Sequence, residues 1–432
     1  MFKNLKKEFE DIKLQEHYGK VNKIVGTTIE SSGPICELGE LCYIHTLSRK
    51  IPCEVIGFNN GSVVLMAFED IFGVKLGDKI YSTGATLNIR IGEELKGKIV
   101  DGLGNPLDED VIIKSGEKKS IYAKPTSALK RKIISEPLEV GVKAIDTLIP
   151  IAKGQRVGIF AGSGCGKSTL LGMIAKNAKA DINVIALVGE RGREVQEFIA
   201  HELGESGMKK SIVVVATSDE PALMRVKAAL TATTIAEYFR DQGLDVLLMM
   251  DSVTRYASAQ REISINTGEK VAQRGYTPSV FSMIPKLLER AGTSDKGTIT
   301  GIYTVLVDGD DMNEPIADTT RGVLDGHIVL DRKLVHKSHF PAIDISSSIS
   351  RVTKNICTQE HLHNMSDFRE LLSSYKEVED LISIGAYKSG SNTKSDRAIS
   401  LHDKCIEFLK QNQDEYISRE ESLEILNEIV KL

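Results

Sequence analysis

Short runs of consecutive apolar residues alternate with amphipathic segments through the middle of the chain. Runs of this length are typical of strands that are buried on both faces, and the segments between them have helical periodicity. Five strands are predicted in this way: Val157–Phe160, Val184–Val188, Ile212–Ala216, Val246–Met250 and Thr300–Leu306. Because strands that alternate with helices usually form a mostly parallel sheet covered by helices, we expect an α/β core over residues 91–355.

The part of the chain before this core has a different pattern. Residues 19–90 contain short β-like runs such as Leu41–Ile44 and Val63–Met66, separated by turn sequences such as Asn59–Gly61. Closely spaced short strands with turn residues between them indicate an antiparallel all-β unit. We therefore expect a small β-barrel domain at residues 19–90.

Both ends of the chain are predicted to be helical. In residues 1–18, apolar residues recur at helical spacing among charged ones, which predicts an amphipathic helix. This helix either binds a partner or caps the barrel, and we favour the partner. Residues 356–432 have the pattern of a helical domain, whose last helix begins with the capping box Ser418–Glu421.

The composition is that of a globular protein of 432 residues, 41% of them hydrophobic and 27% charged. No apolar stretch is long enough to cross a bilayer and the N-terminus is charged, so we expect a cytoplasmic protein. The net charge of −5 argues against a nucleic-acid-binding surface. The six cysteines lack paired spacing, which favours reduced thiols over a zinc site or disulfides.

The segment Ala161–Ser168, with the sequence AGSGCGKS, joins the predicted strand Val157–Phe160 to an apolar helical segment. Small residues let the backbone wrap a polyphosphate, so that amide N–H groups and the N-terminus of the next helix point at its charge. Strand, loop and helix follow in the order that a phosphate-binding loop requires. The segment predicts binding of a nucleoside triphosphate, with contacts from Gly162, Ser163, Gly164, Cys165, Gly166, Lys167, Ser168 and Thr169.

Two residues of this loop have specific chemistry. Lys167 would reach the β and γ phosphates, and the Ser168 hydroxyl would bind a Mg²⁺ ion that bridges them. Asp251 follows the predicted strand Val246–Met250 and supplies a carboxylate for the same ion, because open α/β sheets bind ligands at the carboxyl ends of their strands. The expected cofactors are therefore ATP and Mg²⁺.

A second carboxylate, Glu190, comes shortly after the predicted strand Val184–Val188. We interpret it as the base that orients and activates the attacking water. Sequence spacing equally allows an ion pair of Glu190 with Arg191 or Arg193 at a strand end.

Several motifs together resemble the catalytic subunits of rotary F-type and V-type ATPases. They are the phosphate loop, Gly189–Arg191, Leu247–Arg255, Arg274–Phe281 and Ser348–Arg351. Within that superfamily, Gly309–Asp318 followed by Arg321–Leu330 is similar to the type III protein-export ATPases of the bacterial flagellum and the injectisome. The resemblance covers nearly the whole chain, and it implies a P-loop core of the RecA-like kind.

The resemblance implies a homohexameric ring in which ATP binds between two copies of the chain. Arg351 matches the arginine that one copy contributes to the γ phosphate of its neighbour, where a planar guanidinium stabilises developing charge. An internal ion pair is the alternative for Arg351. Arg191 is implied as catalytic by its place in Gly189–Arg191, and Phe340 matches the aromatic that stacks on adenine, with a core aromatic as the alternative.

The implied function is ATP hydrolysis that supports protein export by a type III secretion apparatus, with the flagellar apparatus preferred. The implied partners are a regulatory or stalk-like protein at the N-terminal helix, export-gate components, and substrate–chaperone complexes at the C-terminal domain. Peripheral association with the inner face of the cell membrane is also implied.

Other functions stay open on the sequence alone. An injectisome ATPase has the same motifs, whereas a rotary ATPase subunit is disfavoured by Asp310–Pro315 and by the short C-terminal region. A ring-shaped RNA translocase is disfavoured by the 5% aromatic content, since single-strand-binding folds stack bases on aromatic side chains. A nucleotide-binding structural subunit normally lacks the carboxylate that Glu190 supplies.

Overall fold

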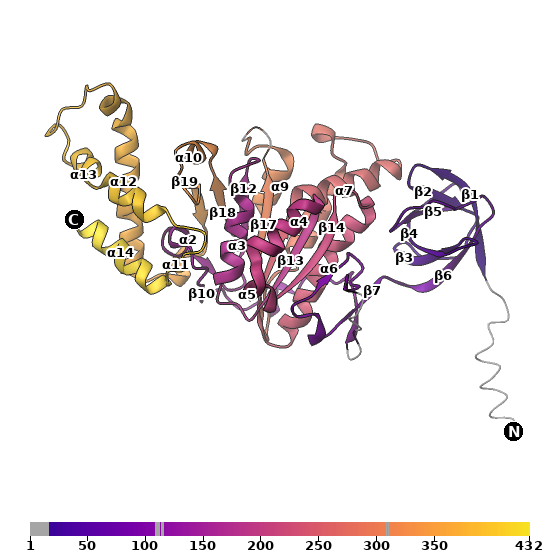
Figure 1. The fold of residues 1–432 in the computed structure, drawn as a ribbon. Helices are drawn as coiled ribbons and strands as arrows, with labels where there is room; N and C mark the ends of the chain where they lie inside the picture. The colour runs from indigo at the N-terminus through magenta and orange to yellow at the C-terminus, as the bar shows by residue number, and fades with distance from the viewer. Residues whose placement is uncertain (1–16, 109–112, 114–115, 308, 310) are drawn as a thin grey trace.

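The computed structural model describes residues 17–108, 113, 116–307, 309 and 311–432. The chain is elongated, with a barrel at one end, an α/β core in the middle and helices at the other end (Figure 1). This arrangement confirms the predicted fold class. Apart from its last two residues, the predicted helix over residues 1–18 lies outside the described part of the chain, as does Asp310 of the motif Gly309–Asp318.

Six strands close the N-terminal barrel in the order β1-β2-β5-β4-β3-β6, and all neighbours are antiparallel. Their apolar side chains alternate inward, and Ile29, Ile44 and Leu65 are fully buried inside. Closure satisfies the backbone at both sheet edges. The strands are β1 (Tyr18–Val25), β2 (Thr28–Ser31), β3 (Glu40–His45), β4 (Lys50–Asn59), β5 (Ser62–Ala67) and β6 (Lys79–Thr86).

The core contains a nine-stranded sheet in the order β19-β18-β12-β17-β15-β13-β14-β8, with β16 paired to β17. Neighbours are parallel except for the pairs β18–β19 and β16–β17. The strands are β8 (Ile99–Val100), β12 (Arg156–Ala161), β13 (Ile182–Glu190), β14 (Ser211–Thr217), β15 (Asp245–Asp251), β16 (Gly292–Thr293), β17 (Thr298–Leu306), β18 (Gly326–Leu330) and β19 (Ile343–Ser350). The five predicted strands are confirmed, whereas the sequence pattern did not reveal the strands at the sheet edges.

Helices cover both faces of this sheet. Along β13, Val184, Ala186 and Val188 belong to the apolar cluster on one face, whereas Ile185 and Leu187 belong to the cluster on the other. Side chains alternate between the faces of a strand, so a strand covered on both sides becomes an uninterrupted apolar run. The helices are α6 (Ala222–Asp241), α7 (Val253–Asn266), α8 (Pro278–Leu288) and α9 (Pro315–Val323) on one face, and α3 (Lys167–Asn177), α4 (Gly192–Glu197) and α5 (Gly204–Lys209) on the other.

The C-terminal part is helical, as predicted. Its main helices are α12 (Gln359–Ser383), α13 (Thr393–Leu409) and α14 (Arg419–Lys431). The predicted cap of the last helix is confirmed, because the Ser418 side chain accepts a hydrogen bond from the backbone N–H of Glu421 at 3.2 Å. No helix in the described ranges is long and apolar enough to cross a membrane.

Shorter elements join these parts. They are the strand pairs β7 (Asn88–Ile91) with β9 (Glu117–Ser120) and β10 (Pro137–Leu138) with β11 (Ile151–Ala152), and the helices α2 (Lys143–Leu148), α10 (Arg332–His336) and α11 (Thr353–Ile356). Helix α2 packs against the C-terminal helices. The ring of His361 in α12 hydrogen-bonds the carbonyl of Thr147 in α2 at 2.7 Å. The C-terminal domain is therefore packed on the core at α2.

Candidate active site

The phosphate loop connects the end of β12 at Ala161 to the start of α3 at Lys167. Gly164 and Gly166 have φ angles of 79° and 80°, a left-handed conformation in which a residue without Cβ avoids steric cost. Within the described residues, no side chain caps the N-terminus of α3. Its free amide groups are therefore available to an anion.

Three charged side chains from different elements meet beside this loop. Lys167 Nζ lies 2.5 Å from Asp251 Oδ1 and 3.8 Å from Glu190 Oε1, and the side chains of Lys167, Glu190 and Asp251 are 12%, 12% and 6% exposed. The Thr304 hydroxyl donates a hydrogen bond to Asp251 Oδ1 at 2.7 Å. The two carboxylates end the neighbouring parallel strands β13 and β15, so the order of the sheet brings them together.

A β-bulge lies directly before Glu190. The register of β13 on β14 shifts between Val188 and Glu190, and Gly189 between them has a φ of 70°. Bulges beside active sites redirect the side chains that follow them. Glu190 Oε1 is buried and accepts no hydrogen bond from any described group. Its nearest ion-pair partner, Lys167 Nζ, is 3.8 Å away, so the oxygen keeps hydrogen-bonding capacity for a group that enters the site.

Burial raises the pKa of the Glu190 carboxyl to about 7, and the charge of Asp251 acts in the same direction. The positive charge of Lys167 opposes this shift. A carboxyl with such a pKa exchanges its proton near neutral pH, which is the property that a general base requires.

The two arginines that follow Glu190 are paired elsewhere. Arg191 is 77% exposed and lies 3.7 Å from Glu194, whereas Arg193 is 86% exposed and bonds Glu197 at 2.8 Å. The ion pair that was the alternative for Glu190 is therefore absent from the described residues, where the cation nearest to its carboxylate is Lys167. Arg191, a predicted catalytic residue, lies outside the cluster.

One charged residue near the cluster was missed by the sequence analysis. Arg255, in the first turn of α7, contributes positive charge that lowers the pKa of Glu190. The Arg255 side chain packs closely on Gly189. A Cβ atom added to that glycine would lie 3.0 Å from the Cβ of Arg255. The sequence analysis contained Arg255 only as the last residue of the motif Leu247–Arg255 and gave it no role.

Asp251 and Ser168 are the available metal ligands. A carboxylate and a hydroxyl beside a phosphate loop are hard oxygen donors, which suit Mg²⁺. This ion takes few protein ligands and completes its shell with water and substrate phosphates. The described residues contain no group of three or more His, Cys, Asp or Glu side chains that could hold a metal alone. The donor set therefore fits Mg²⁺ that arrives with a nucleotide.

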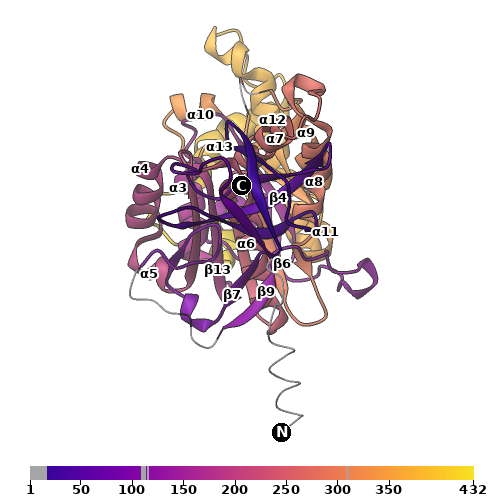
Figure 2. The ribbon, with the colours of Figure 1, turned by 90° about the vertical axis from the view of Figure 1, so that its right-hand side faces the viewer.

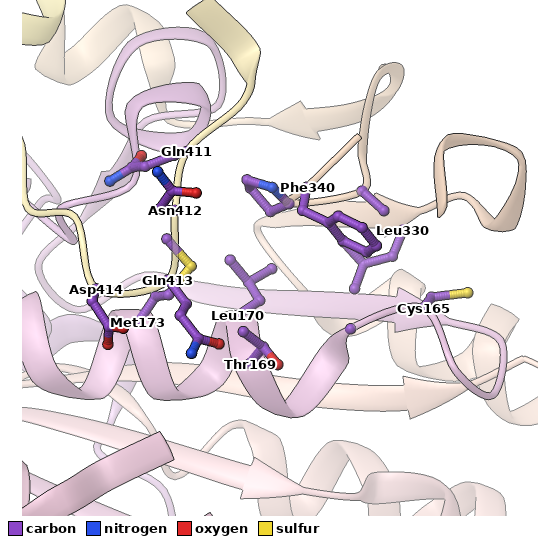
Figure 3. A pocket seen from close by; sticks show the side chains of 13 residues that line it. Cys165, Thr169, Leu170, Met173, Leu330, Phe340, Gln411, Asn412, Gln413 and Asp414 are labelled. Atoms are coloured by element: carbon purple, nitrogen blue, oxygen red, sulfur yellow. The ribbon is translucent and has the colours of Figure 1, made fainter. Parts of the chain in front are cut away.

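A pocket of about 600 Å³ opens beside the phosphate loop and the first turns of α3 (Figure 3). Phe340 lies across this hollow from a loop of the C-terminal domain, with Leu170 of α3 below. Phe340 is 46% exposed, so it forms a pocket wall and the core alternative is wrong. The lining residues are Cys165, Gly166, Thr169, Leu170, Met173, Leu330, Phe340, Pro341, Ala342, Gln411, Asn412, Gln413 and Asp414.

Gln411 fixes the wall opposite Phe340. It is only 6% exposed, and its backbone N–H donates to the Phe340 carbonyl at 3.0 Å. Its side-chain amide accepts from the Lys143 N–H at 2.8 Å and donates to the Gly141 carbonyl at 2.9 Å. The pocket is thus shared by the core and the C-terminal domain. An apolar slot with an open aromatic ring beside a phosphate loop fits a nucleobase.

Arg351 lies far from these groups along the sheet. It follows β19, and its backbone N–H bonds the Asp325 carbonyl at 2.9 Å. Gly326 pairs with Ser350 at this end, whereas the phosphate loop follows the opposite end of β12, beside Leu330. The Arg351 side chain is exposed and forms no ion pair or hydrogen bond with any other described residue. The internal ion pair is therefore not seen in the described part of the chain.

Three family models match successive parts of the chain. The ATP synthase alpha/beta family model of the beta-barrel domain matches residues 21–84, and that of the nucleotide-binding domain matches residues 141–350. The T3SS EscN ATPase C-terminal domain matches residues 357–428. Together they span all three structural parts.

Curated relatives match over almost their full length. The Flagellum-specific ATP synthase of Bacillus subtilis (strain 168) is 54% identical, over 96% of this chain and 95% of its own. The protein of the same name from Borreliella burgdorferi is 48% identical, over 99% of both chains. The Type 3 secretion system ATPase of Xanthomonas euvesicatoria is 43% identical, over 98% of this chain and 97% of its own.

The fold has a solved counterpart. The assembled ATPase EscN from the type III secretion system of enteropathogenic E. coli superposes with a TM-score of 0.91 at 48% identity, over 95% of this chain and 100% of that one. Agreement of sequence and structure over the full length shows common ancestry. This chain belongs to the flagellum-specific and type III secretion ATPases of the ATP synthase alpha/beta family.

Proposed function

We propose that this chain hydrolyses ATP to support protein export by a flagellar type III apparatus. The observation that carries the proposal is the cluster of Lys167, Glu190 and Asp251 beside a phosphate loop. It occurs in a chain that is 54% identical to a flagellum-specific ATP synthase. The cluster combines a cation for phosphate, a carboxylate for a metal and a carboxyl suited to proton transfer.

Nucleotide binding would change the partner of Lys167. Its ammonium group bonds Asp251 at 2.5 Å, and the β and γ phosphates would replace that carboxylate. The released Asp251 and the Ser168 hydroxyl would then hold Mg²⁺, which neutralises charge on the phosphates when it is bound. The amides of residues 162–169 would bind the phosphates, and Phe340 would stack on adenine.

Glu190 would then orient the attacking water and accept its proton. Its buried Oε1, which accepts no hydrogen bond from the described residues, supplies the acceptor, and its raised pKa supplies the basicity. Arg191 would have to swing from its exposed position beside Glu194 to reach the γ phosphate. Arg255 is nearer to Glu190 and supports the ionised form of its carboxyl.

The remaining charge for the transition state would come from a second copy. Arg351 is exposed and unpaired in the described residues, yet it lies away from its own phosphate loop, so it would serve a neighbouring site. EscN has been solved as an assembled ATPase, and in complex with its central stalk EscO at 47% identity to this chain. We propose a ring of six copies and a stalk-like partner at the helix that the sequence predicts for residues 1–18.

The other partners follow from an export role. Export-gate components, and substrate–chaperone complexes at the C-terminal domain, would use the energy of hydrolysis. The ring would act in the cytoplasm, associated peripherally with the inner face of the cell membrane. An injectisome role is the second candidate, because Type 3 secretion system ATPases are 43% to 44% identical. The flagellar role is favoured by flagellum-specific relatives at 54% and 48% identity.

The proposal is tested by comparing Lys167→Ala with Lys179→Ala. Lys167 is buried in the cluster, whereas Lys179 is 62% exposed just beyond the same helix. We expect Lys167→Ala to abolish MgATP hydrolysis and, in a deletion strain, motility and flagellin export, while Lys179→Ala preserves them. Normal export with Lys167→Ala would contradict the proposed function. Intact flagella with lost effector secretion in the deletion strain would assign the chain to an injectisome.

A further inference from the structure

An arm with exposed apolar side chains projects from the side of the core. This arm, residues 124–135, lies between β9 and β10, and on it Leu129 is 98% exposed and Ile133 is 85% exposed. Figure 2 looks along the long axis from the barrel end and shows the arm projecting sideways on the side of α8 and α11. Helices α3 and α4 lie on the other side in this view.

The arm is anchored to the core at Arg131 and Lys132, so Leu129 and Ile133 project from an anchored backbone. The Arg131 guanidinium donates to the Ala291 carbonyl at 2.8 Å and also to the Glu289 carbonyl. The Thr293 hydroxyl donates to the Lys132 carbonyl at 2.6 Å. A side chain at Gly292 would collide with the Arg131 guanidinium, so the glycine makes room for this anchor. Aliphatic side chains that an anchored backbone holds in water do not gain the favourable free energy of burial within one chain. Contact with a second protein surface would supply it.

Three ion pairs and one backbone hydrogen bond connect Arg131 of the arm to Arg351. Glu289 lies 3.5 Å from Arg131 and 2.6 Å from Arg156. Arg156 in turn bonds Asp325 at 3.1 Å, and the Asp325 carbonyl accepts the backbone N–H of Arg351 at 2.9 Å. The arm and Arg351 are therefore linked by direct contacts on one side of the core.

We propose that Leu129 and Ile133 pack against a second copy of this chain, across the interface through which Arg351 reaches the neighbouring nucleotide. This proposal rests on the proposed ring. A second copy is the occupant because the arm is linked to Arg351 on the same side of the core. In the proposed ring, Arg351 contacts a neighbouring copy, and that copy would also cover the surface beside it. The exposed Lys130 and Lys132 lie between the two aliphatic residues in the chain and add polar groups to the patch, as protein interfaces combine apolar and polar surface.

Photo-crosslinking tests the contact directly. A benzophenone amino acid replaces Leu129 in the full-length chain, which is irradiated with Mg²⁺ and a non-hydrolysable ATP analogue. We expect covalent dimers of the chain. The same probe at Ile384, which is 75% exposed in the C-terminal domain, is the control and gives no comparable dimer. Equal yields at the two positions in an assembled sample would overturn the proposal.

A double variant measures the energetic role of the arm. Leu129→Ser with Ile133→Ser should raise the protein concentration for half-maximal assembly and ATPase activity about tenfold or more, because apolar burial is lost. Ile384→Ser should leave that concentration unchanged, and thermal unfolding should be the same for all three proteins.

The outcomes separate the arm from the ring. If wild type forms a ring and the double variant forms it at the same concentration, the arm proposal fails and the ring stands. If wild type sediments as a monomer at every concentration with nucleotide present, the ring fails and the arm proposal fails with it.

Discussion

The two sides of the core differ in how their charges are satisfied. On the phosphate-loop side, Lys167 lies within 3.8 Å of both Glu190 and Asp251, and the three side chains are nearly buried. On the side of the arm, Arg351 is exposed and has no side-chain partner in the described residues. A buried, mutually paired cluster is complete in one chain, whereas an exposed arginine beside apolar surface is not. The difference indicates a site that one copy prepares and the next completes.

The largest expected effect on kcat comes from Arg351, on the side of the core that bears the arm. Arg351→Ala should lower kcat by about three to five powers of ten, the range known for arginine fingers in phosphoryl transfer. Arg351→Lys should recover little activity, because an ammonium group lacks the planar fork that contacts two phosphoryl oxygens. Steady-state ATP hydrolysis measures both. A kcat within about tenfold of wild type for Arg351→Ala would remove the arginine from the mechanism.

The next largest effect on kcat comes from Glu190, in the charged cluster on the phosphate-loop side. Glu190→Gln keeps the shape of the side chain but cannot accept a proton, so kcat should fall by about two to four powers of ten. Nucleotide binding, measured by fluorescence titration, should persist because Lys167 and the loop amides are intact. Glu197→Gln, at a position 49% exposed, is the control and should behave as wild type. Wild-type turnover by Glu190→Gln would show that another group activates the water.

The pH dependence gives an intermediate effect. Burial raises the pKa of Glu190 to about 7, so the carboxyl is protonated below that pH and ionised above it. A general base must be ionised, and kcat/KM should therefore fall about tenfold for each pH unit below about 7. The residual activity of Glu190→Gln should lack this titration. A flat profile of wild type from pH 6 to pH 8 would contradict the role of Glu190.

The smallest effect comes from Phe340, the aromatic wall of the pocket beside the phosphate loop. Phe340→Ala should raise KM for ATP about tenfold and leave kcat almost unchanged, because stacking on the base holds ground state and transition state equally. Phe340→Tyr should preserve KM, since the aromatic face is retained. A lowered kcat with unchanged KM would indicate that Phe340 supports the catalytic geometry and does not bind the base.

The features that could be predicted from sequence are local ones. The phosphate loop is a continuous segment whose glycines and lysine have fixed spacing, and buried parallel strands are apolar runs such as Val184–Val188. The position of Asp251 at a strand end was enough to place it beside Lys167, because parallel strands share one carboxyl edge. Short or polar edge strands such as β8 and β19 have no such pattern.

The features that could not be predicted depend on contacts between distant segments. Gln411 bonds Phe340 across the boundary between core and C-terminal domain, so the second wall of the base pocket is visible only in the fold. The partner of Glu190 proved to be Lys167 and not the adjacent Arg191, because the chain turns after the bulge at Gly189. The exposure of the arm beside Arg351 likewise follows from tertiary packing.

The central claim is that each active site is shared between two identical chains. Mixing Arg351→Ala with Glu190→Gln in equal amounts, and measuring ATP hydrolysis under conditions where wild type sediments as a ring, tests it most directly. In a cyclic ring of random composition, about one quarter of the interfaces combine an intact Glu190 from one chain with an intact Arg351 from the next. We therefore predict that the mixture recovers a substantial part of wild-type activity, although each variant alone is inactive. Activity no greater than the sum of the two variants would contradict the shared site.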